Sequence, residues 1–257
     1  MGKLVLMVAA LLFNASCGLG SIVFSTGFEA PEYTVDVNID GQNGWTTAGS
    51  SAWARVKSEA YGGWTGHGQH LIVNGYSFYA VSPNLDCTET PKTRITFDMK
   101  PGDSAKTADS WAGGIEILDA DGKAITSMTL VSDGLNVSSG YIAMSNGGTS
   151  WWDTGLDWSF GGAATTYIFD IVVDSSSQTW SLSVNGGSEI SGNWGGFMGK
   201  TVSTDGSVGT IRLRGGNNNA ATGLVSFDNI LVETVPEPIT LSLILSAGLI
   251  GVLRRRA

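Results

Sequence analysis

The sequence predicts an all-β protein, built as an antiparallel two-sheet sandwich or a barrel. Short apolar alternations recur about every 10–15 residues through the middle of the chain. Clusters of Gly, Asn, Asp and Ser separate them, and no apolar period of about 3.6 residues is sustained. No internal repeat of about 20–50 residues is visible, which argues against a propeller or a solenoid. These observations favour one β-rich domain over residues 21–233.

Strands are expected where apolar and polar residues alternate between turn-forming clusters. The expected strands are Ile22–Phe28, Ala52–Lys57, His70–Asn74, Lys92–Met99, Gly114–Leu118, Ala124–Leu130, Tyr141–Met144, Thr166–Val173, Thr179–Val184, Gly209–Arg214 and Gly223–Val232. The segments Asp119–Gly122, Asp174–Ser177 and Asn185–Gly187 supply residues that tolerate the positive-φ positions of hairpin turns. The apolar residues of Trp180–Val184 share one face, so we expect Trp180 in the core.

The charge of the chain excludes one class of partner. Lys and Arg number 14 against 23 Asp and Glu, which gives a formal net charge of −9 over 257 residues. Because nucleic acid is bound through a basic surface, we expect no nucleic-acid partner. Only 14% of the residues are charged and 42% are hydrophobic, so the chain is expected to fold.

Residues 1–20 have the pattern of a secretory signal peptide. Lys3 supplies the positive charge, residues 4–13 are an apolar run, and the small residues that follow fit a cleavage region. The run is too short for a spanning helix. After cleavage Cys87 would be the only cysteine, so no internal disulfide could form, and we expect it to be buried as a small apolar residue.

Residues 234–257 have three parts in order: a Pro-Glu-Pro tripeptide, the uncharged run 239–253 and a basic cluster. The residues that define the two ends are Pro236, Glu237, Pro238, Arg254, Arg255 and Arg256. A helix formed by the uncharged run would reach about 22 Å, short of the ~30 Å hydrocarbon core of a membrane. Such a helix could hold the chain in a membrane only marginally, with the arginines on the cytoplasmic side.

This tail resembles the PEP-CTERM sorting signal of bacteria that make extracellular polysaccharide. The resemblance implies a transmembrane helix before processing, cleavage near the tripeptide by an exosortase, and release or attachment at the cell surface. A plain C-terminal anchor is the alternative. Both interpretations imply export through the inner membrane and place residues 21–233 outside the cytoplasm.

The middle of the chain also resembles a known group of domains. The segments that carry this resemblance are Gly27–Glu29, Asp40–Trp45, Gly66–Val73, Tyr167–Gly186 and Ser226–Ile230. They are similar to the concanavalin A-like, laminin-G-like and carbohydrate-binding-module jelly rolls of bacterial surface proteins. The resemblance implies a jelly-roll sandwich whose first and last strands pair side by side.

Two carboxylates near the ends of the domain are candidate calcium ligands. Pairing of the first and last strands would bring Glu29 beside Asp228, and carboxylates joined by backbone carbonyls suit Ca²⁺, which takes six to eight oxygen ligands. Many carbohydrate-binding modules are similar in placing a structural calcium there. The alternative is a pair of ordinary solvated carboxylates. No other cofactor is expected.

The sequence contains no recognisable catalytic arrangement. A glycosidase needs two carboxylates about 5–10 Å apart across the scissile bond. The odd separation of Glu116 and Asp119 places them on opposite faces of a strand, so we expect Glu116 to face solvent. No Ser lies in a Gly-x-Ser-x-Gly context, and His67 and His70 have no matching third ligand for zinc. We therefore expect a protein that is not an enzyme.

Nine tryptophans are a high load for this length, and a flat indole stacks well on sugar rings. Neighbouring strand residues point to opposite faces, so one of Trp151 and Trp152 is expected in the core and the other is free to bind. The candidate glycan-binding residues are Trp151, Trp152, Asp153, Trp158 and Asn146. The alternative is that these aromatics only fill the core.

Together these patterns predict an exported, surface-sorted β-sandwich that binds or structurally supports extracellular polysaccharide. One alternative is a carbohydrate-active enzyme, a glycoside hydrolase or lyase, which would release reducing sugar. The other is a structural or adhesive surface protein without affinity for glycans.

Overall fold

The protein is all-β, as the sequence predicts. The computed structural model describes residues 20–49, 53–59, 64, 66–75, 78–88, 91–101, 111–132, 139–147, 151–159, 165–196, 200–204, 206–216 and 224–236, and these contain no helix. The strands are β1 (Ile22–Thr26), β2 (Thr46–Gly49), β3 (Trp53–Lys57), β4 (His70–Asn74), β5 (Phe78–Val81), β6 (Lys92–Lys100), β7 (Trp111–Asp119), β8 (Ala124–Ser132), β9 (Ser139–Ser145), β10 (Trp151–Ser159), β11 (Tyr167–Asp174), β12 (Thr179–Val184), β13 (Ile190–Asn193), β14 (Val208–Arg214) and β15 (Leu224–Val235).

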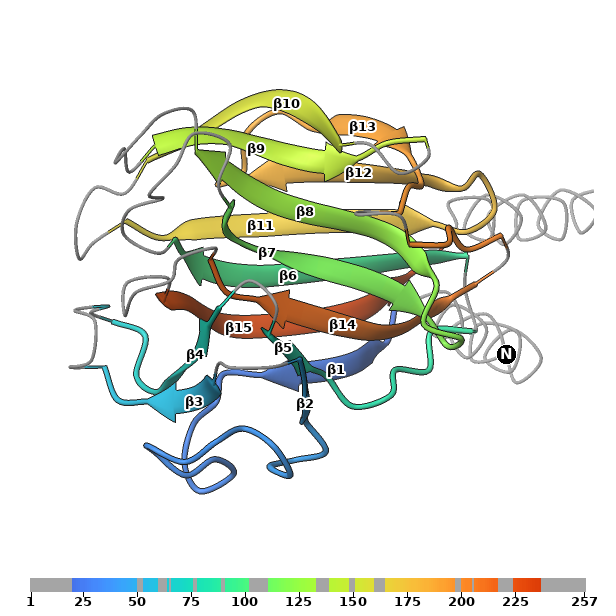
Figure 1. Ribbon diagram of the computed structural model, residues 1–257. Helices are drawn as coiled ribbons and strands as arrows, with labels where there is room; N and C mark the ends of the chain where they lie inside the picture. The colour runs from blue at the N-terminus through green and yellow to red at the C-terminus, as the bar shows by residue number, and fades with distance from the viewer. Residues whose placement is uncertain are drawn as a thin grey trace, which may run out of the picture.

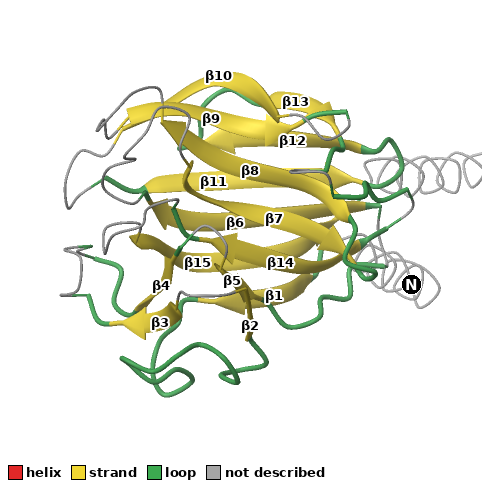
Figure 2. Cartoon of the chain, viewed as in Figure 1, coloured by secondary structure: helices red, strands yellow, loops and turns green. Residues whose placement is uncertain are grey.

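The strands form two antiparallel sheets that pack face to face as a jelly-roll sandwich (Figures 1 and 2). The eight-stranded sheet, called sheet A here, runs β13-β12-β11-β6-β15-β4-β3, with β1 pairing alongside β15. The seven-stranded sheet, called sheet B, runs β10-β9-β8-β7-β14-β5-β2. In both sheets, several neighbouring strands are distant in the sequence. Each sheet is therefore held together by long-range strand pairing.

Each strand expected from the alternation pattern corresponds to an observed strand within a few residues. The strands without a prediction are β2, β5, β10 and β13. Three of these are only four residues long, which is too short for alternation to be recognised. The fourth, β10, is interrupted by a bulge between Asp153 and Asp157, which breaks its period of two.

The last strand, β15, organises sheet A. It pairs with β6 over most of its length, with β4 at its start and with β1 toward its end. The register places Thr26 of β1 opposite Ile230 and Phe227 opposite Met99 of β6. The expectation that the first and last strands pair side by side is therefore confirmed.

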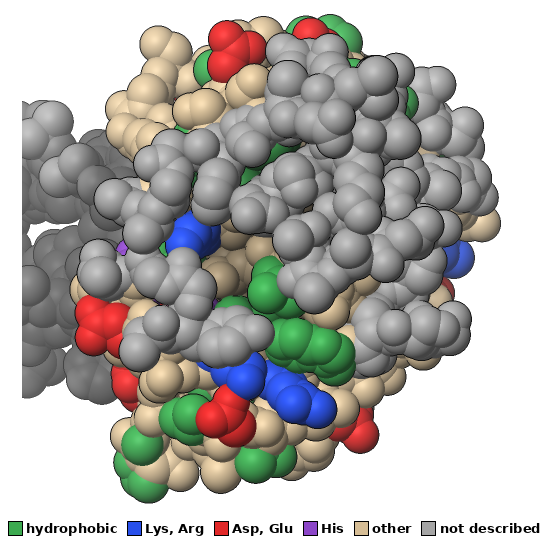
Figure 3. All heavy atoms as spheres, turned by 60° about the vertical axis from the view of Figure 1, so that its left-hand side comes forward, with side chains coloured by type: hydrophobic (Ala, Val, Ile, Leu, Met, Phe, Trp, Pro, Cys, Tyr) green, Lys and Arg blue, Asp and Glu red, His purple; other side chains and the backbone are tan. Residues whose placement is uncertain are grey.

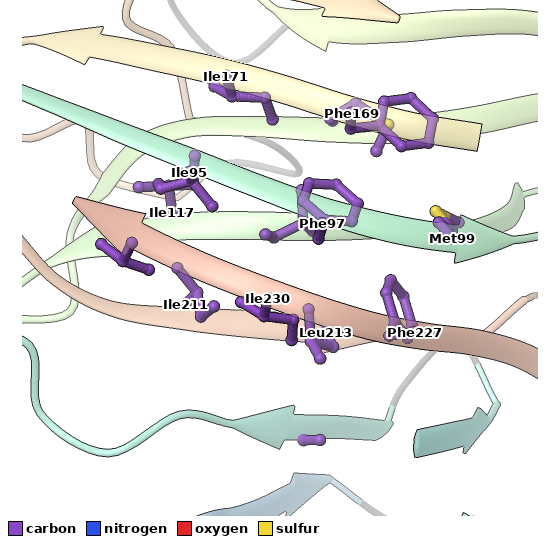
Figure 4. Packing of buried hydrophobic residues seen from close by; sticks show 14 of the residues in the cluster. Ile95, Phe97, Met99, Ile117, Phe169, Ile171, Ile211, Leu213, Phe227 and Ile230 are labelled. Carbon is purple, nitrogen blue, oxygen red and sulfur yellow. The ribbon is translucent and has the colours of Figure 1, made fainter. Parts of the chain in front are cut away.

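The core lies between the two sheets and consists of alternate side chains from each (Figure 4). In β6, Ile95, Phe97 and Met99 are buried, whereas the intervening residues face away from the core. The ring of Phe97 stacks on Phe169 of β11 at a centroid distance of 5.1 Å. Sheet B contributes Ile117, Ile211 and Leu213 to the same cluster.

The predicted buried residues and turns occupy their expected places. Trp180 is 1% exposed, and Cys87 is fully buried with the pKa of its thiol raised by burial. Asp119–Gly122 joins β7 to β8, with Asp119 Oδ1 accepting hydrogen bonds from the backbone N–H groups of Asp121 and Lys123. The turn after β12 uses positive φ at Asn185 and Gly186, as predicted.

The two predicted sorting segments lie almost wholly outside the described residues. Residues 1–19 and 237–257 are not described. The signal peptide, Glu237, Pro238 and the terminal arginines Arg254, Arg255 and Arg256 therefore stay predictions. Within the part of the chain that the structure describes, no helix has the length and apolar character needed to cross a membrane.

Replacing Phe97 by Ala should destabilise the sandwich by about 3–5 kcal/mol, because it deletes a fully packed ring between Phe169 and Phe227 and leaves a cavity. Urea unfolding followed by tryptophan fluorescence measures this loss. The matched control is Ile168→Ala on the neighbouring strand, whose side chain is 53% exposed and should change stability by about 0.5 kcal/mol or less. Equal losses for the two variants would contradict the assigned core.

Candidate functional site

The pairing of β1 with β15 brings the residue pair Glu29 and Asp228 to one end of sheet A. Gly27 follows β1 directly and lies against β15. A Cβ at Gly27 would lie 3.5 Å from Asn229 Oδ1, 3.7 Å from Asp228 Oδ1 and 3.9 Å from Glu29 Cγ. The predicted proximity of Glu29 and Asp228 is thus present, with an amide oxygen beside them.

Irregular backbone aims these side chains. Phe28 and Asn229 both have positive φ, 58° and 48°, a conformation uncommon for residues other than glycine. The β15–β6 pairing is irregular between Asp228 and Leu231, where a bulge changes the register. Bulges re-aim side chains and recur beside functional sites, so this end of β15 is a candidate site.

The loop before β4 wraps onto Glu29. The carboxylate Oε1 of Glu29 accepts a hydrogen bond of 3.0 Å from the backbone N–H of Gln69. Gly68 has φ of +54°, and a Cβ there would lie only 2.1 Å from Glu29 Oε1. Glycine suits position 68 because it adopts this left-handed conformation without strain, and a side chain there would require the Glu29 carboxylate to move.

A histidine and a third carboxylate complete this group. His67 Nδ1 lies 3.2 Å from Asp228 Oδ2 and 3.6 Å from Asp98 Oδ2. The amide of Asn229 donates to Asp98 Oδ2 at 2.7 Å. We call Glu29, Asp98, Asp228 and His67 the carboxylate cluster.

The imidazole of His67 is held from two further sides. Trp64, which is buried, stacks on His67 at 4.0 Å between ring centroids. The Nε2 atom lies 3.4 Å from Thr166 Oγ1, and that hydroxyl also accepts a 2.6 Å hydrogen bond from Trp64 Nε1. These contacts fix the ring plane toward the carboxylates of Asp98 and Asp228.

The electrostatics of the cluster are unbalanced. Burial raises the pKa of Asp228 to about 7, and the negative charges of Asp98 and Glu29 act in the same direction, against a backbone hydrogen bond from Asn229. Burial lowers the pKa of His67 below its ordinary value in spite of the adjacent Asp98 and Glu59. The neutral imidazole does not offset the negative charge of Asp98 and Asp228, so protonation of Asp228 or binding of a cation would reduce the repulsion between the carboxylates.

The oxygen ligands that a cation would find here come from more than acidic side chains. Asp228 Oδ1 is buried and has no hydrogen-bond partner among the described residues. Over that same part of the chain, no group of three or more His, Cys, Asp or Glu side chains is arranged to hold a metal ion. A cation at Glu29 and Asp228 would therefore need backbone carbonyls or the Asn229 amide oxygen as further ligands.

The tryptophans of β10 divide between the core and the surface. Trp158 is 1% exposed and its Nε1 donates to the backbone oxygen of Val131 at 2.9 Å, so it is a core residue and presents no stacking face. Trp151 lies opposite Ser145, on the outer face of sheet B, and is half-buried. Trp152 is 42% exposed at the edge of the sandwich and packs against Trp180 at 6.3 Å between ring centroids.

The two polar candidates near these tryptophans already have local partners. Asn146 Oδ1 accepts a 2.8 Å hydrogen bond from the backbone N–H of Asn193, which joins β13 to the end of β9. Asp153 is exposed, and its Oδ1 accepts from the N–H of Gly155 at 2.8 Å. Asp153 keeps a carboxylate oxygen accessible, whereas Asn146 serves mainly to position backbone.

The expectation that Glu116 faces solvent is wrong. It does lie on the outer face of sheet B, but it is 2% exposed and accepts hydrogen bonds from Lys200 and Arg214. Arg212 approaches it at 3.8 Å, and Tyr79 receives a 2.8 Å hydrogen bond from Arg214. We call Tyr79, Glu116, Lys200, Arg212 and Arg214 the basic cluster.

Sequence reasoning missed the basic cluster because its members are far apart in the chain. The alternation of Arg212-Leu213-Arg214 places two cations on one face of β14, and this was the only local signal. The pairing of Arg212 with Glu116 across β14 and β7, and of Arg214 with Tyr79 across β14 and β5, follows from the sheet order. Burial among these groups raises the pKa of the Tyr79 hydroxyl.

Acidic and basic groups are unevenly placed on the surface. Figure 3 shows acidic side chains dispersed near the edge of one face, with Lys and Arg side chains lying against hydrophobic ones in its lower part. On sheet A, Arg55 and Lys57 both lie over the ring of Trp53, at 5.3 and 5.9 Å from its centroid. Two cations of sheet A therefore lie beside one aromatic ring.

No protein-family model matches the chain, and no curated protein matches it. Several solved structures superpose on it in part. A carbohydrate esterase from the Shiga toxin-encoding bacteriophage phi24B superposes with a TM-score of 0.54 at 14% identity, covering 84% of this chain and 99% of that one. The CBM2 module of the evolved Dit protein of Lactobacillus casei phage J-1 gives 0.49 at 10% identity, covering 85% and 97%. The cellulose-induced protein Cip1 gives 0.47 at 12% identity, covering 81% and 96%. At 14% identity the likeness to the phage esterase shows the fold alone.

The pH dependence of stability should reveal the buried carboxyl of Asp228. Its pKa is about 7 in the folded chain against an ordinary 3.8, so its protonated form favours folding. That contribution is complete below about pH 4 and is lost as pH rises through about 7. We expect Asp228→Asn to remove this loss when unfolding free energies are measured from pH 4 to 8 with a chelator present.

The exposed turn residue Asp121 gives the control, because Asp121→Asn removes the same charge outside the cluster. The wild type and the Asp228→Asn variant share all other titrating groups. The difference between their curves of unfolding free energy against pH therefore reports Asp228. Parallel wild-type and Asp228→Asn curves would contradict the raised pKa.

Proposed function

We propose that this protein is exported, sorted to the cell surface or extracellular matrix, and binds or structurally supports extracellular polysaccharide without catalysing a reaction. The observation that carries the proposal is the indole of Trp152. It is the aromatic member of the exposed large hydrophobic side chains among the described residues; the others are Ile22, Val37 and Ile168.

Trp152 has the physical properties of a stacking platform for a sugar. Its ring packs on buried Trp180 and so keeps one orientation, while 42% of the residue stays open to solvent. A rigid, half-open indole offers apolar area at little cost in side-chain entropy. Asp153, the next residue along β10, is exposed and lies on the opposite face of the strand.

The fold supports the same proposal. The phage protein that shares this fold at a TM-score of 0.54 is a carbohydrate esterase, so the architecture serves at least one protein that acts on carbohydrate. Fold alone does not determine function. The argument for binding therefore rests on Trp152 and its surroundings.

The sorting proposal rests on the two ends of the sequence. Strand β15 ends at Val235, and the Pro-Glu-Pro tripeptide begins at the next residue, Pro236. An exosortase would therefore meet the tripeptide next to a folded domain and the apolar run beyond it. Loss of Arg254, Arg255 and Arg256 from the intact mass of the surface protein is the expected mark of processing.

We infer that the carboxylate cluster holds a structural Ca²⁺ between Glu29 and Asp228. The unpartnered Oδ1 of Asp228, the neutral state of His67 and the nearby amide oxygen of Asn229 support this assignment. The ion would join the start of the domain to its last strand. It would stabilise the fold and take no part in chemistry.

Retention on insoluble polysaccharides tests the binding proposal. We expect the purified protein to be retained selectively on one or more polymers of a panel, and Trp152→Ala to weaken retention about tenfold, the loss of one well-packed stacking contact. Ile168→Ala removes a comparable exposed apolar side chain from sheet A and should leave retention unchanged. Retention of Trp152→Ala at the wild-type level would contradict the assignment of Trp152 as the glycan-binding residue. Release of reducing sugar from the polymer would show that the protein is an enzyme.

Calcium titration of thermal stability tests the metal proposal. Adding millimolar Ca²⁺ after chelator treatment should raise the melting temperature by several degrees, because the ion binds only the folded chain. The rise should be larger at pH 8 than at pH 6, since protons compete for the carboxyl of Asp228, whose pKa is about 7. Glu29→Gln should abolish the rise and Glu32→Gln, at an exposed position nearby, should preserve it. A melting temperature that calcium does not change would refute the site.

A further inference from the structure

One end of the sandwich carries no positively charged side chain. Residues 124–199 contain no Lys, Arg or His, although they make up more than a quarter of the chain. They supply the three outermost strands at one side of each sheet, β10, β9 and β8 of sheet B and β13, β12 and β11 of sheet A. These six strands lie together in the upper part of Figure 1. We call them the cation-free end, and Trp152 lies at its edge.

The nearest strands with positive side chains lie well inside each sheet. In sheet B the order runs from β10 through β9, β8 and β7 before it reaches β14, which carries Arg212 and Arg214. In sheet A it runs from β13 through β12 and β11 before it reaches β6, with Lys92, Arg94 and Lys100. At about 4.8 Å per strand these separations are about 19 and 14 Å. Both exceed the Debye length of about 8 Å at physiological salt, so these charges are largely screened from the edge.

The two lysines that flank the cation-free segment in sequence already have acidic partners. Lys123 pairs with Asp121 at 3.4 Å in the turn before β8. Lys200 pairs with Glu116 of β7. Neither lysine is therefore left to balance negative charge on the edge strands.

Edge strand β10 carries two carboxylates that no cation balances. Asp153 and Asp157 are both exposed, and neither forms an ion pair within the part of the chain that the structure describes. Asp170 of β11 differs, because Arg94 of the neighbouring strand β6 binds it with two hydrogen bonds. The negative charge of β10 is therefore open to solvent.

The bulge in β10 brings these carboxylates close to each other and to the indole of Trp152. Asp153 lies opposite Ala143 and Asp157 opposite Tyr141, which are two residues apart on β9. Their strand positions are therefore about 7 Å apart. Asp153 directly follows Trp152, so their Cα atoms are about 3.8 Å apart. A sugar on the indole lies within about one Debye length of Asp153, whose charge acts through solvent and needs no contact with the sugar.

The exposed polar side chains of β13, the other edge strand at this end, are uncharged. They are Ser191 and Asn193. Two hydrogen bonds of 2.8 Å fix the backbone of Asn193, one from its N–H to Asn146 Oδ1 and one from Trp180 Nε1 to its oxygen. Hydroxyl and amide groups exchange hydrogen bonds with sugar hydroxyls and offer no positive charge to a carboxylate or a sulfate.

We propose that the Trp152 site takes an uncharged polysaccharide, and that Asp153 and Asp157 are specificity-determining residues that exclude polymers bearing carboxylate or sulfate groups. The proposal rests on the polysaccharide binding proposed above and assigns its substrate class. Like charges brought together at a binding surface suppress the wrong partner and leave the contacts of the right one intact. An uncharged sugar stacks on the indole whether or not the carboxylates are present.

The test uses pairs of polymers that share a backbone and differ in charge. The pairs are hydroxyethylcellulose with carboxymethylcellulose, dextran with dextran sulfate, and fully methyl-esterified polygalacturonate with polygalacturonate. Each polymer is coupled to beads, and bound and free protein are measured without added calcium. We expect the protein to bind an uncharged member at least about tenfold more tightly than its anionic counterpart at low salt. Raising the salt to about 0.5 M should narrow the difference, because screening weakens the repulsion.

The double variant Asp153→Asn/Asp157→Asn separates the effect of these carboxylates from that of the net charge of the chain. Asparagine keeps the Oδ1 atom that accepts from the N–H of Gly155, so the bulge is preserved. We expect this variant to bind the anionic polymer at least about threefold more tightly and the uncharged polymer as before. The control Glu32→Gln/Asp86→Asn removes two exposed carboxylates outside the cation-free end and should leave both affinities unchanged.

Each outcome decides a definite question. Equal binding to both members of every pair, a difference that salt does not narrow, or wild-type selectivity in Asp153→Asn/Asp157→Asn with an unchanged melting temperature would overturn the inference. An equal gain in the control variant would also overturn it, because the net charge of the chain would then set the selectivity. If only anionic polymers are bound, this inference fails and the proposed function stands. Binding to no polymer at all refutes both.

Discussion

The shared core between the two sheets is the constraint on which the other features depend. Because strand side chains alternate, burying Ile115 and Ile117 of β7 and Ile211 and Leu213 of β14 places Glu116, Arg212 and Arg214 on the outer face of sheet B. A shift of one residue in either strand would bury those charges in an apolar core, at a cost far above the stability of a domain. The position of the basic cluster is therefore a consequence of packing on the other side of the same strands.

The closing strand β15 has a comparable effect at the carboxylate cluster. It must pair with β1, β4 and β6 at once, and the bulge after Asp228 is where its register with β6 changes. Pairing brings three carboxylates from distant parts of the chain together around a histidine whose burial keeps it neutral. The two clusters are thus opposite in sign, and each lies where the order of strands joins residues that are distant in sequence.

Sequence patterns predicted what depends on local alternation and turn chemistry. The all-β class, the positions of the longer regular strands, the burial of Trp180 and Cys87 and the turn at Asn185 and Gly186 all follow from residues within a few positions of each other. The prediction that Glu29 lies near Asp228 came from the resemblance to jelly rolls. Sequence could not predict that Glu116 is buried, because its partners Lys200 and Arg214 become neighbours only through sheet order and a distant loop. It also could not assign Trp151, Trp152 and Trp158 to separate environments, since the bulge in β10 interrupts the alternation between them.

The central claim is that this sandwich binds polysaccharide through the exposed indole of Trp152 at its edge. A crystal structure of the protein with a short oligosaccharide from a polymer that retains it tests this claim most directly. The account predicts a sugar ring stacked on the indole of Trp152. Sugar bound only at another surface would contradict it.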